Sequence, residues 1–241
     1  MSSNQNYGKL YLIPVSLGDS STDKVFPPLN ALIIDKIEDF IVENEKSARR
    51  FIKQILPEKS QQELKLKGLN KFTEPSEIPT FLDAAKEGRN IGLLSEAGCP
   101  GVADPGAEIV KLAHQYNIQV VPLIGPSSIL LAMMASGMNG QSFTFHGYLP
   151  IDKKERKQEL KQLERISSEK NQAQIFIETP YRNMKFLEDL IQSLHSSTRI
   201  CVACDLSLES EFIKTATASE WKNIKADLHK RPAIFIIQKD I

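Results

Sequence analysis

Short apolar runs alternate with amphipathic stretches along the first half of the chain. The apolar runs are 10–15, 39–42, 91–94 and 118–124. Apolar residues recur at helical spacing in 28–37, 45–56, 75–88 and a segment that begins near Asp104. Strands that alternate with such helices are typical of a parallel sheet with crossover helices. The stretch 58–74 is polar and rich in lysine, and it is expected to be a surface excursion.

The alternation restarts after Gly125 and predicts a second domain. A segment at 126–136 is apolar on all sides, which predicts a buried helix with Met133 and Met134 in the core. Further strands are expected at 142–148, 173–178, 199–205, 211–217 and 233–238, and helices at 153–170 and 180–194. We therefore predict two α/β domains. Residues 1–124 form a mainly parallel sheet with helices on both faces, and residues 125–241 form a mixed sheet.

Charge and apolar content limit the partners and the cellular location that the sequence favours. The 241 residues include 30 basic and 30 acidic side chains, so a nucleic-acid partner needs a local basic patch. Two candidates are the charged helix 153–170, whose interspersed acids favour a solvated face, and the group Arg49, Arg50 and Lys53. No apolar run approaches the roughly 20 residues of a membrane span. Residues 1–6 lack the pattern of a signal peptide, so we expect a cytoplasmic protein.

Several well-known chemical signatures are missing from the sequence. No G-x-G-x-x-G follows the first strand, and neither G-x-x-x-x-G-K-[ST] nor G-x-S-x-G occurs. These absences disfavour a nicotinamide enzyme, a P-loop ATPase and a hydrolase with a nucleophile elbow. Cys201 and Cys204 lie three apart in a predicted strand and so point to opposite faces, which favours buried thiols over a metal or redox pair. We expect no metal site.

Two glycine-containing turns follow apolar strands and carry the main functional signal. Residues 95–106 follow the strand at 91–94, and residues 125–128 follow the strand at 120–124. A turn after a parallel strand exposes main-chain N–H and C=O groups at the carboxyl edge of the sheet, where α/β folds hold small ligands. Glycine lets a ligand approach the main chain closely. The sequence therefore predicts a ligand site built largely from backbone.

The same turns belong to an ordered set of motifs that resembles a known family. Residues 95–100 with 104–106 are similar to the S-D-A-G-x-P…D-P-G segment of S-adenosylmethionine methyltransferases with the tetrapyrrole methylase fold, and 121–128 to their V-x-P-x-P-G-P-S-A element. Residues 135–137, 145–150 and 178–182 resemble A-S-G, F-x-G-F-L-P and E-S-P-H-R. These last segments point to the ribosomal RNA small subunit (cytidine 2′-O) methyltransferase I branch.

The resemblance implies a fold, a cofactor and a set of site residues. It implies two α/β domains with S-adenosylmethionine in the cleft between them, in a homodimer. The positions that match the methyl-donor contacts of the family are Pro14, Ser95, Glu96, Ala97, Val102, Ser127, Ser128 and Ile177. Substrate binding is expected of Glu178, Tyr181 and Arg182. Arg182 begins a predicted helix, where a cation is electrostatically unfavourable, and this favours a role with an anion or a partner.

Three segments depart from the ribosomal-RNA branch. Residues 14–19, 43–46 and 68–73 stand where that branch has T-P-I-G-N-L, E-D-T-R and S-Y-H-E-H-N segments on its substrate side. A carboxylate near the positively charged sulfonium of the cofactor would be favourable, and Glu96 is the candidate nearest in sequence to the predicted cofactor positions. Glu178, Asp104 and Glu43 are alternatives for accepting a proton from a hydroxyl, although Asp104 followed by Pro105 is also a common helix-capping pattern.

The sequence therefore predicts a methyltransferase of ribosomal RNA processing that acts on a ribose 2′-hydroxyl. The alternatives are a corrin or porphyrin methyltransferase, and a protein that binds S-adenosylmethionine without catalysis. The first alternative is disfavoured by segments 145–150 and 178–182 but favoured by the absence of a net positive charge. The second is favoured by the altered substrate-side segments.

Overall fold

The protein is described by a computed structural model that covers residues 6–19 and 25–240. Its contacts divide the chain into two compact units, Met1–Ser127 and Ser128–Ile241. Residues 1–5, on which the signal-peptide expectation depends, lie outside the described residues. Within the described residues, every helix is too short or too polar to cross a lipid bilayer.

The first unit contains a five-stranded sheet in which all strands run parallel, in the order β3-β2-β4-β1-β5. The strands are β1 (Leu10–Ile13), β2 (Asp39–Val42), β3 (Lys65–Gly68), β4 (Ile91–Leu94) and β5 (Val120–Pro122). In the register, Leu10 lies between Ile91 and Val120. Because the strands are parallel, their carboxyl ends meet at one edge, where the predicted ligand turns begin.

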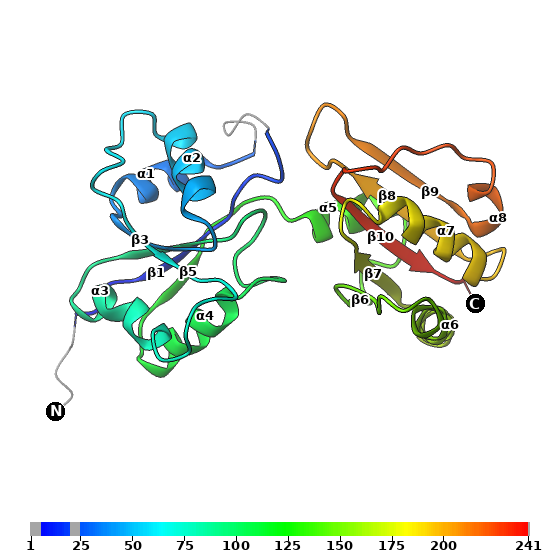
Figure 1. Ribbon diagram of the computed structural model, residues 1–241, viewed down its shortest axis with the longest axis horizontal. Helices are drawn as coiled ribbons and strands as arrows, with labels where there is room; N and C mark the ends of the chain where they lie inside the picture. The colour runs from blue at the N-terminus through cyan, green and yellow to red at the C-terminus, as the bar shows by residue number, and fades with distance from the viewer. Residues whose placement is uncertain (1–5, 20–24, 241) are drawn as a thin grey trace. The chain divides into compact units, whose positions relative to one another are not determined.

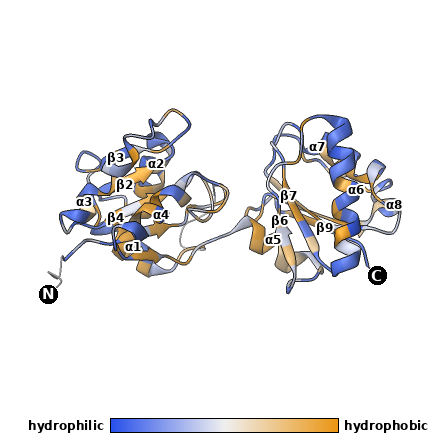
Figure 2. Ribbon diagram, turned by 90° about the horizontal axis from the view of Figure 1, so that it is seen from below, coloured by the Kyte–Doolittle hydropathy of each residue, from blue (hydrophilic) through white to orange (hydrophobic). Residues whose placement is uncertain are grey.

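Helices cover both faces of this sheet (Figure 1). The helices are α1 (Pro28–Asp35), α2 (Glu45–Ile55), η2 (Ile78–Leu82), α3 (Asp83–Lys86) and α4 (Gly106–Gln115). One core cluster joins α1 and α2 to strand residues such as Phe40 and Ile13, and another joins η2, α3 and α4 to Ile91 and Leu93. Strands β2 and β4 are accordingly hydrophobic in Figure 2. The predicted parallel α/β arrangement is confirmed.

Two expectations for the first unit are wrong in detail. The polar stretch 58–74 contains β3, an edge strand whose Lys65 and Lys67 are exposed. Charged edge strands do not show the apolar alternation of inner strands, since one side of the backbone faces solvent. The helix expected at 75–88 is instead a 3₁₀ turn followed by a four-residue α-helix. Pro79 lies in that turn and cannot donate a backbone hydrogen bond.

The second unit contains a mixed five-stranded sheet in the order β6-β7-β10-β8-β9. The strands are β6 (Phe143–Phe145), β7 (Ala173–Ile177), β8 (Arg199–Cys204), β9 (Phe212–Thr217) and β10 (Ala233–Gln238). Only β6 and β7 pair in parallel; the other three pairings are antiparallel. The helices are α5 (Ser128–Ser136), α6 (Lys153–Lys170), α7 (Asn183–Ser193) and α8 (Ala218–Trp221). The predicted mixed sheet is confirmed.

Aromatic rings form the centre of the second core. Phe186 of α7 lies edge-on to Phe235 and Phe176, with ring centroids 4.9 and 6.2 Å apart. Both strand cysteines are buried, and Cys204 belongs to this cluster whereas Cys201 does not. Burial and the adjacent Asp205 raise the pKa of the Cys204 thiol to about 11. The thiols are therefore protonated core groups at neutral pH.

Helix α5 is only partly buried, which contradicts the expectation that it lies entirely in the core. Met133 is 6% exposed, but Met134 is 80% exposed. The helix packs on β8, β9 and β10, and within it only Ala132, Met133 and Ser136 are buried. The uniformly apolar sequence therefore does not distinguish its packed face from its exposed face.

Candidate functional site

Main-chain hydrogen bonds connect the exits of β1 and β4 at the carboxyl edge of the first sheet. The N–H of Val15 donates to the carbonyl of Gly98 at 2.9 Å, and the N–H of Gly98 donates back at 2.9 Å. Gly98 has a φ of 73°, a left-handed conformation that side-chain-bearing residues avoid. The turn 95–98 is thereby folded back against the residue that follows Pro14.

The exit of β5 approaches the same place. A Cβ atom on Gly125 would lie 2.3 Å from Cβ of the buried Pro14, so only glycine fits this close approach. The turn that follows β5 is therefore adjacent to the exit of β1. Ser127, the last residue of the first unit, is two residues further along. Pro14 and the two glycine-containing turns predicted from the sequence are thus brought together at one sheet edge.

The turn after β4 uses its buried side chain internally and leaves the next two residues exposed. The Ser95 hydroxyl donates within the turn, with the carbonyls of Ala97 and Gly98 3.3 and 3.2 Å away. Glu96 and Ala97 are exposed. Ser95 therefore shapes the turn and leaves Glu96 and Ala97 exposed.

The Glu96 position is held by two residues that sequence analysis did not connect with it. The backbone N–H of Glu96 donates to Oε1 of Glu43 at 3.1 Å. The hydroxyl of Ser47 in α2 donates to Oε1 of Glu96 at 2.5 Å. The sequence indicates Glu43 only as a proton acceptor, and it gives no indication of Ser47. The available signal was that β2 ends at the same sheet edge as β4, which brings the start of α2 to this turn.

Three carboxylates concentrate negative charge beside this turn. Burial raises the pKa of Glu43; the N–H of Glu96 lowers it, and the charges of Asp104 and Glu96 raise it further. Burial also raises the pKa of Asp104, against the effect of hydrogen bonds from the N–H groups of Gly106 and Gly101, both 2.8 Å long. Such a region favours a cationic group on a ligand.

The loop 99–105 combines an exposed side chain with unusual backbone. Val102 is 50% exposed. Gly101 and Ala103 have φ values of 82° and 62°. The bonds from Gly101 and Gly106 to Asp104 Oδ1 fix this loop to the start of α4. Helix α4 begins at Gly106, so Asp104 caps it from one position earlier than a standard N-cap, with Pro105 in between.

A polar pocket of about 120 Å³ lies beside the Glu96 turn. Its lining comes from the β1 exit, the turn and α2: Val15, Ser16, Leu17, Gly18, Asp19, Ser47, Arg50, Phe51, Gln54, Glu96 and Ala97. Arg50, which belongs to the predicted basic group, therefore lines the same pocket as Glu96 and Ala97, two of the residues predicted to contact the methyl donor. Arg49 does not line it, and its guanidinium donates to the carbonyl of Gln61 at 2.5 Å.

The predicted residues of the second unit lie at the start of α5 and at the exit of β7. Ser128 is the first residue of α5. Ile177 ends β7, is half-buried, and its N–H donates to the carbonyl of Gly147 at 3.0 Å. This bond joins the exit of β7 to segment 145–150. The two family-like segments 145–150 and 178–182 are therefore neighbours.

Glu178 and Arg182 pair with each other. Nε and Nη2 of Arg182 donate to Oε1 of Glu178 at 3.1 and 2.6 Å, and the N–H of Thr179 donates to the same oxygen at 2.6 Å. The Glu178 side chain is only 6% exposed. Arg182 is the residue before α7, and its charge is compensated by this carboxylate. The pair clamps the turn that follows β7.

Tyr181, between them, has a different setting. Its side chain is 72% exposed. His229 and Lys230 lie beside its ring, with centroids of the two rings 6.4 Å apart and Lys230 Nζ 5.8 Å from the tyrosine centroid. Sequence analysis missed both residues, because nothing in the local pattern of 226–232 relates it to β7.

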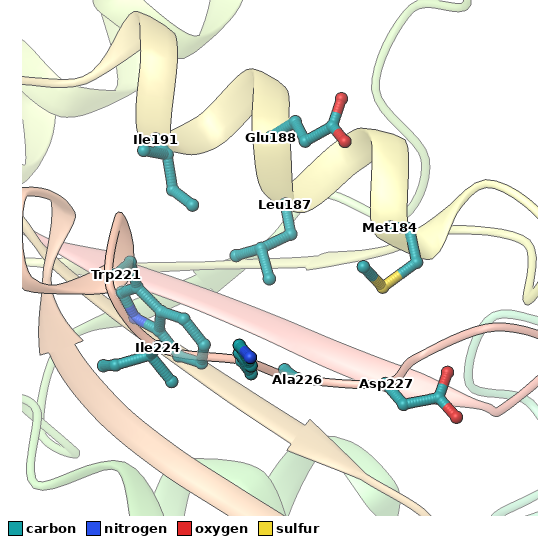
Figure 3. Close-up of a pocket in the computed structure, with 9 residues that line it drawn as sticks. Met184, Leu187, Glu188, Ile191, Trp221, Ile224, Ala226 and Asp227 are labelled. Atoms are coloured by element: carbon teal, nitrogen blue, oxygen red, sulfur yellow. The ribbon is translucent and has the colours of Figure 1, made fainter.

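An apolar pocket of about 550 Å³ lies elsewhere in the second unit (Figure 3). Met184, Leu187 and Ile191 of α7 point toward Trp221 and Ile224 across it. The Trp221 indole N–H donates to the carbonyl of Ile200 at 2.8 Å, which fixes one wall. The described lining includes none of the residues predicted for cofactor or substrate. Among residues 6–19 and 25–240, no group of acidic, histidine and cysteine side chains could hold a metal ion.

Comparisons with known proteins agree with this arrangement. Residues 34–222 match the family model described as Tetrapyrrole (Corrin/Porphyrin) Methylases. Ribosomal RNA small subunit methyltransferase I of Bacillus subtilis (strain 168) is 32% identical over 219 residues, which cover 90% of this chain and 70% of that protein. The protein of the same name from Escherichia coli O157:H7 is 28% identical over 241 residues, or 98% and 79% of the two chains.

Solved structures confirm the fold. The crystal structure of the methyltransferase CobJ superposes with a TM-score of 0.62 at 16% identity, over 96% of this chain and 94% of that one. Uroporphyrin-III C-methyl transferase from Thermus thermophilus, complexed with S-adenyl homocysteine, gives a TM-score of 0.58 at 14% identity, over 96% and 98% of the two chains. At such identities the likeness concerns the fold alone.

Proposed function

We propose that this chain methylates ribosomal RNA at a ribose 2′-hydroxyl. The premise is that it belongs to the tetrapyrrole methylase family of S-adenosylmethionine-dependent methyltransferases. The support for this acceptor is the similarity to ribosomal RNA small subunit methyltransferase I from several bacteria, which extends over 90–98% of the chain in four of them. The order of the segments 145–150 and 178–182 supports the same branch.

The observation that carries the proposal is the backbone-built edge at Pro14, 95–98 and 125–127. The fit rests on close backbone packing: Gly98 is left-handed, Gly125 lies against Pro14, and the exposed Glu96 and Ala97 lie beside them. In the proposed site the first unit contributes Pro14, Ser95, Glu96, Ala97, Val102 and Ser127. The contributions of Ser128 and Ile177 to the same ligand stay predictions of the resemblance.

The bound cofactor supplies an already activated methyl group, so the protein has mainly to position the acceptor. Glu96 and Glu43 provide negative charge that suits a sulfonium or an ammonium group. Among the proposed proton acceptors, Glu178 already accepts three hydrogen bonds on one oxygen, and Asp104 Oδ1 accepts two from its own loop. Burial raises the pKa of Glu43 and of Asp104 alike, but Glu43 accepts one hydrogen bond, from the N–H of Glu96. We therefore favour Glu43, as the carboxylate with the fewest hydrogen bonds of the three.

The proposal is tested in two steps with the full chain. Calorimetric titration with S-adenosylhomocysteine measures cofactor binding, and transfer of labelled methyl from S-adenosylmethionine is then assayed with small ribosomal subunits and with uroporphyrinogen. We expect binding, and label in the ribosomal RNA at a ribose. Label in the tetrapyrrole alone would overturn the acceptor, and binding without transfer to either substrate would overturn the proposed catalysis.

Gly98 provides a specific variant for the cofactor site. A Gly98→Ala change keeps sufficient space, with Leu17 Cδ2 3.5 Å from the new Cβ, but imposes a left-handed conformation that costs about 1–2 kcal/mol. We expect weaker S-adenosylhomocysteine binding and lower stability. Gly140→Ala is the matched control, because Gly140 has open space around it and no positive φ. Equal affinities of the two variants would contradict a role of this turn in binding.

The homodimer and the cytoplasmic location stay predictions. Sedimentation of the purified chain tests the first of them.

A further inference from the structure

An aromatic and cationic patch lies beside the exit of β7. We define the Tyr181 patch as Tyr181, His229 and Lys230, which come from segments nearly fifty residues apart. All three side chains are exposed, Tyr181 to 72%. An aromatic residue of the core would be covered by apolar neighbours, whereas this ring is accompanied by an imidazole and an ammonium group.

Both segments of the patch are held in place by other contacts. The N–H of Lys230 donates to the carbonyl of Pro180 at 3.1 Å, and Lys230 has a φ of 60°. The Glu178–Arg182 pair clamps the tyrosine turn from the other side. Preceding His229, the N–H of Leu228 donates to Sδ of Met184 at 3.4 Å. The patch is therefore preorganised, which reduces the entropy lost when a ligand binds.

Of the cations that the structure describes in and next to the patch, Lys230 is the one without a carboxylate partner. Arg182 is paired with Glu178, and Arg231 with Asp205 at 2.8 Å. Among the described residues, Lys230 forms no ion pair with a carboxylate, and its contact with the Tyr181 ring is near the ~6 Å limit of a cation–π interaction. An exposed ring with a nearby uncommitted ammonium group matches two parts of a nucleotide: a base that stacks and a phosphate that carries charge.

We propose that the Tyr181 patch binds one nucleotide of single-stranded RNA, with the base stacked on Tyr181 and a phosphate beside Lys230. Single strands are favoured because their bases can be unstacked and presented to an aromatic side chain, whereas the bases of an A-form duplex are not available for stacking. This inference rests on the proposed function, and it assigns part of the RNA contact to His229 and Lys230 outside the resemblance segments.

The test measures RNA binding separately from methyl transfer. The chain has one tryptophan, Trp221, which is 2% exposed, so Tyr181→Trp adds an exposed fluorophore at the patch. A short cytidine-rich RNA quenches the added emission, and the same RNA annealed to its complement does not. Tyr181→Ala and Tyr181→Leu raise the Kd for the single strand about tenfold, whereas Tyr181→Phe retains the affinity of the wild type.

Lys230→Ala weakens binding and makes the slope of log K against log salt shallower by about 0.7, the value for one phosphate of a single strand. Lys214→Ala, at an exposed position of the edge strand β9 and outside both candidate basic patches, is the matched control and changes neither quantity. Binding of S-adenosylhomocysteine stays unchanged in every variant, which shows that the fold is intact.

Two results overturn the inference in distinguishable ways. If the wild type methylates RNA and Tyr181→Ala binds the single strand as tightly as the wild type, the patch is not an RNA contact and the proposed function stands. If the wild type binds S-adenosylhomocysteine but neither the single strand nor small ribosomal subunits, the RNA acceptor itself is wrong, and the inference fails with it.

Discussion

Backbone strain at single residues marks the loop between β4 and α4. Ala103 has a φ of 62°, although it lacks the freedom of glycine. A left-handed conformation costs an L-residue roughly 1–2 kcal/mol, and such residues persist where surrounding contacts over-determine them. Here the two hydrogen bonds to Asp104 Oδ1 hold the loop on both sides of Ala103.

Replacement of Ala103 by glycine relieves this strain. After the greater entropy of glycine in the unfolded chain is subtracted, we expect Ala103→Gly to raise the free energy of unfolding by about 0.5–1 kcal/mol. Urea denaturation measures the change. Ala107→Gly, an exposed site in the first turn of α4, is the matched control and should lower stability by up to about 1 kcal/mol. Destabilisation by both changes would show that Ala103 is unstrained.

Glu43 couples the ligand edge to pH. Its pKa is raised in the folded protein from the ordinary value of 4.5, chiefly by burial. Between 4.5 and the raised pKa, the folded state binds more protons than the unfolded state, so stability falls as pH rises through this window.

The Glu43→Gln variant lacks this titration but keeps an amide oxygen that can accept the N–H of Glu96. We therefore expect its unfolding free energy to decline less than that of the wild type as pH rises above 4.5. Chemical denaturation over a pH series measures both curves. Glu63→Gln, an exposed acid in the loop before β3, should follow the wild type. A Glu43→Gln curve parallel to the wild type would contradict the assigned coupling.

At the scale of elements, a buried ion pair joins α6 to α7. Arg156 donates to Oδ2 of Asp189 from Nε at 3.1 Å and from Nη2 at 2.5 Å. Its Nη1 also donates to the carbonyls of Pro150 and Ile151, at 2.9 and 2.7 Å. The guanidinium thus fixes both helices and the end of segment 145–150, although α6 was expected to be a solvated charged helix.

Removal of the carboxylate leaves the buried guanidinium without its counter-charge. We expect Asp189→Ala to lower the unfolding free energy by about 3–5 kcal/mol. Glu169→Ala breaks the exposed pair with Arg165, whose side chains are 60% and 70% exposed, and should cost less than about 0.5 kcal/mol. The two values come from denaturant unfolding of each variant. A loss of similar size in both would mean that burial of Asp189 is energetically unimportant.

Elements with strong local signals could be predicted from the sequence, and those that depend on tertiary context could not. Helix α6 has the predicted bounds, because Asp152 caps its start and Asn171 ends it in a left-handed conformation. Strand β3 has no such signal, since its pairing with β2 alone makes it a strand. Met134 is likewise apolar, as core residues are, but its residue type does not reveal that it lies on the exposed side of α5.

At the scale of the whole molecule, the same distinction applies to the candidate site. The parallel direction of the strands follows from the alternation of elements, so the placement of Pro14 and 95–98 at one sheet edge could be predicted, whereas the order of the strands could not. The contacts of Ser47 with Glu96, and of Lys230 with Tyr181, join residues about fifty apart and depend on how the elements pack. The local sequence pattern does not indicate which residues fifty positions apart come into contact. Ser47 and Lys230 could therefore not be predicted from it.

The strand order of the first unit also determines when that unit can form during translation. Strand β1 leaves the ribosome first, yet both of its neighbours, β4 and β5, are synthesised some eighty and a hundred and ten residues later, as the register of Leu10 with Ile91 and Val120 shows. Until then the apolar β1 has no pairing partner. At elongation rates of about 5–20 residues per second, β1 therefore stays without its pairing partners for several seconds during synthesis.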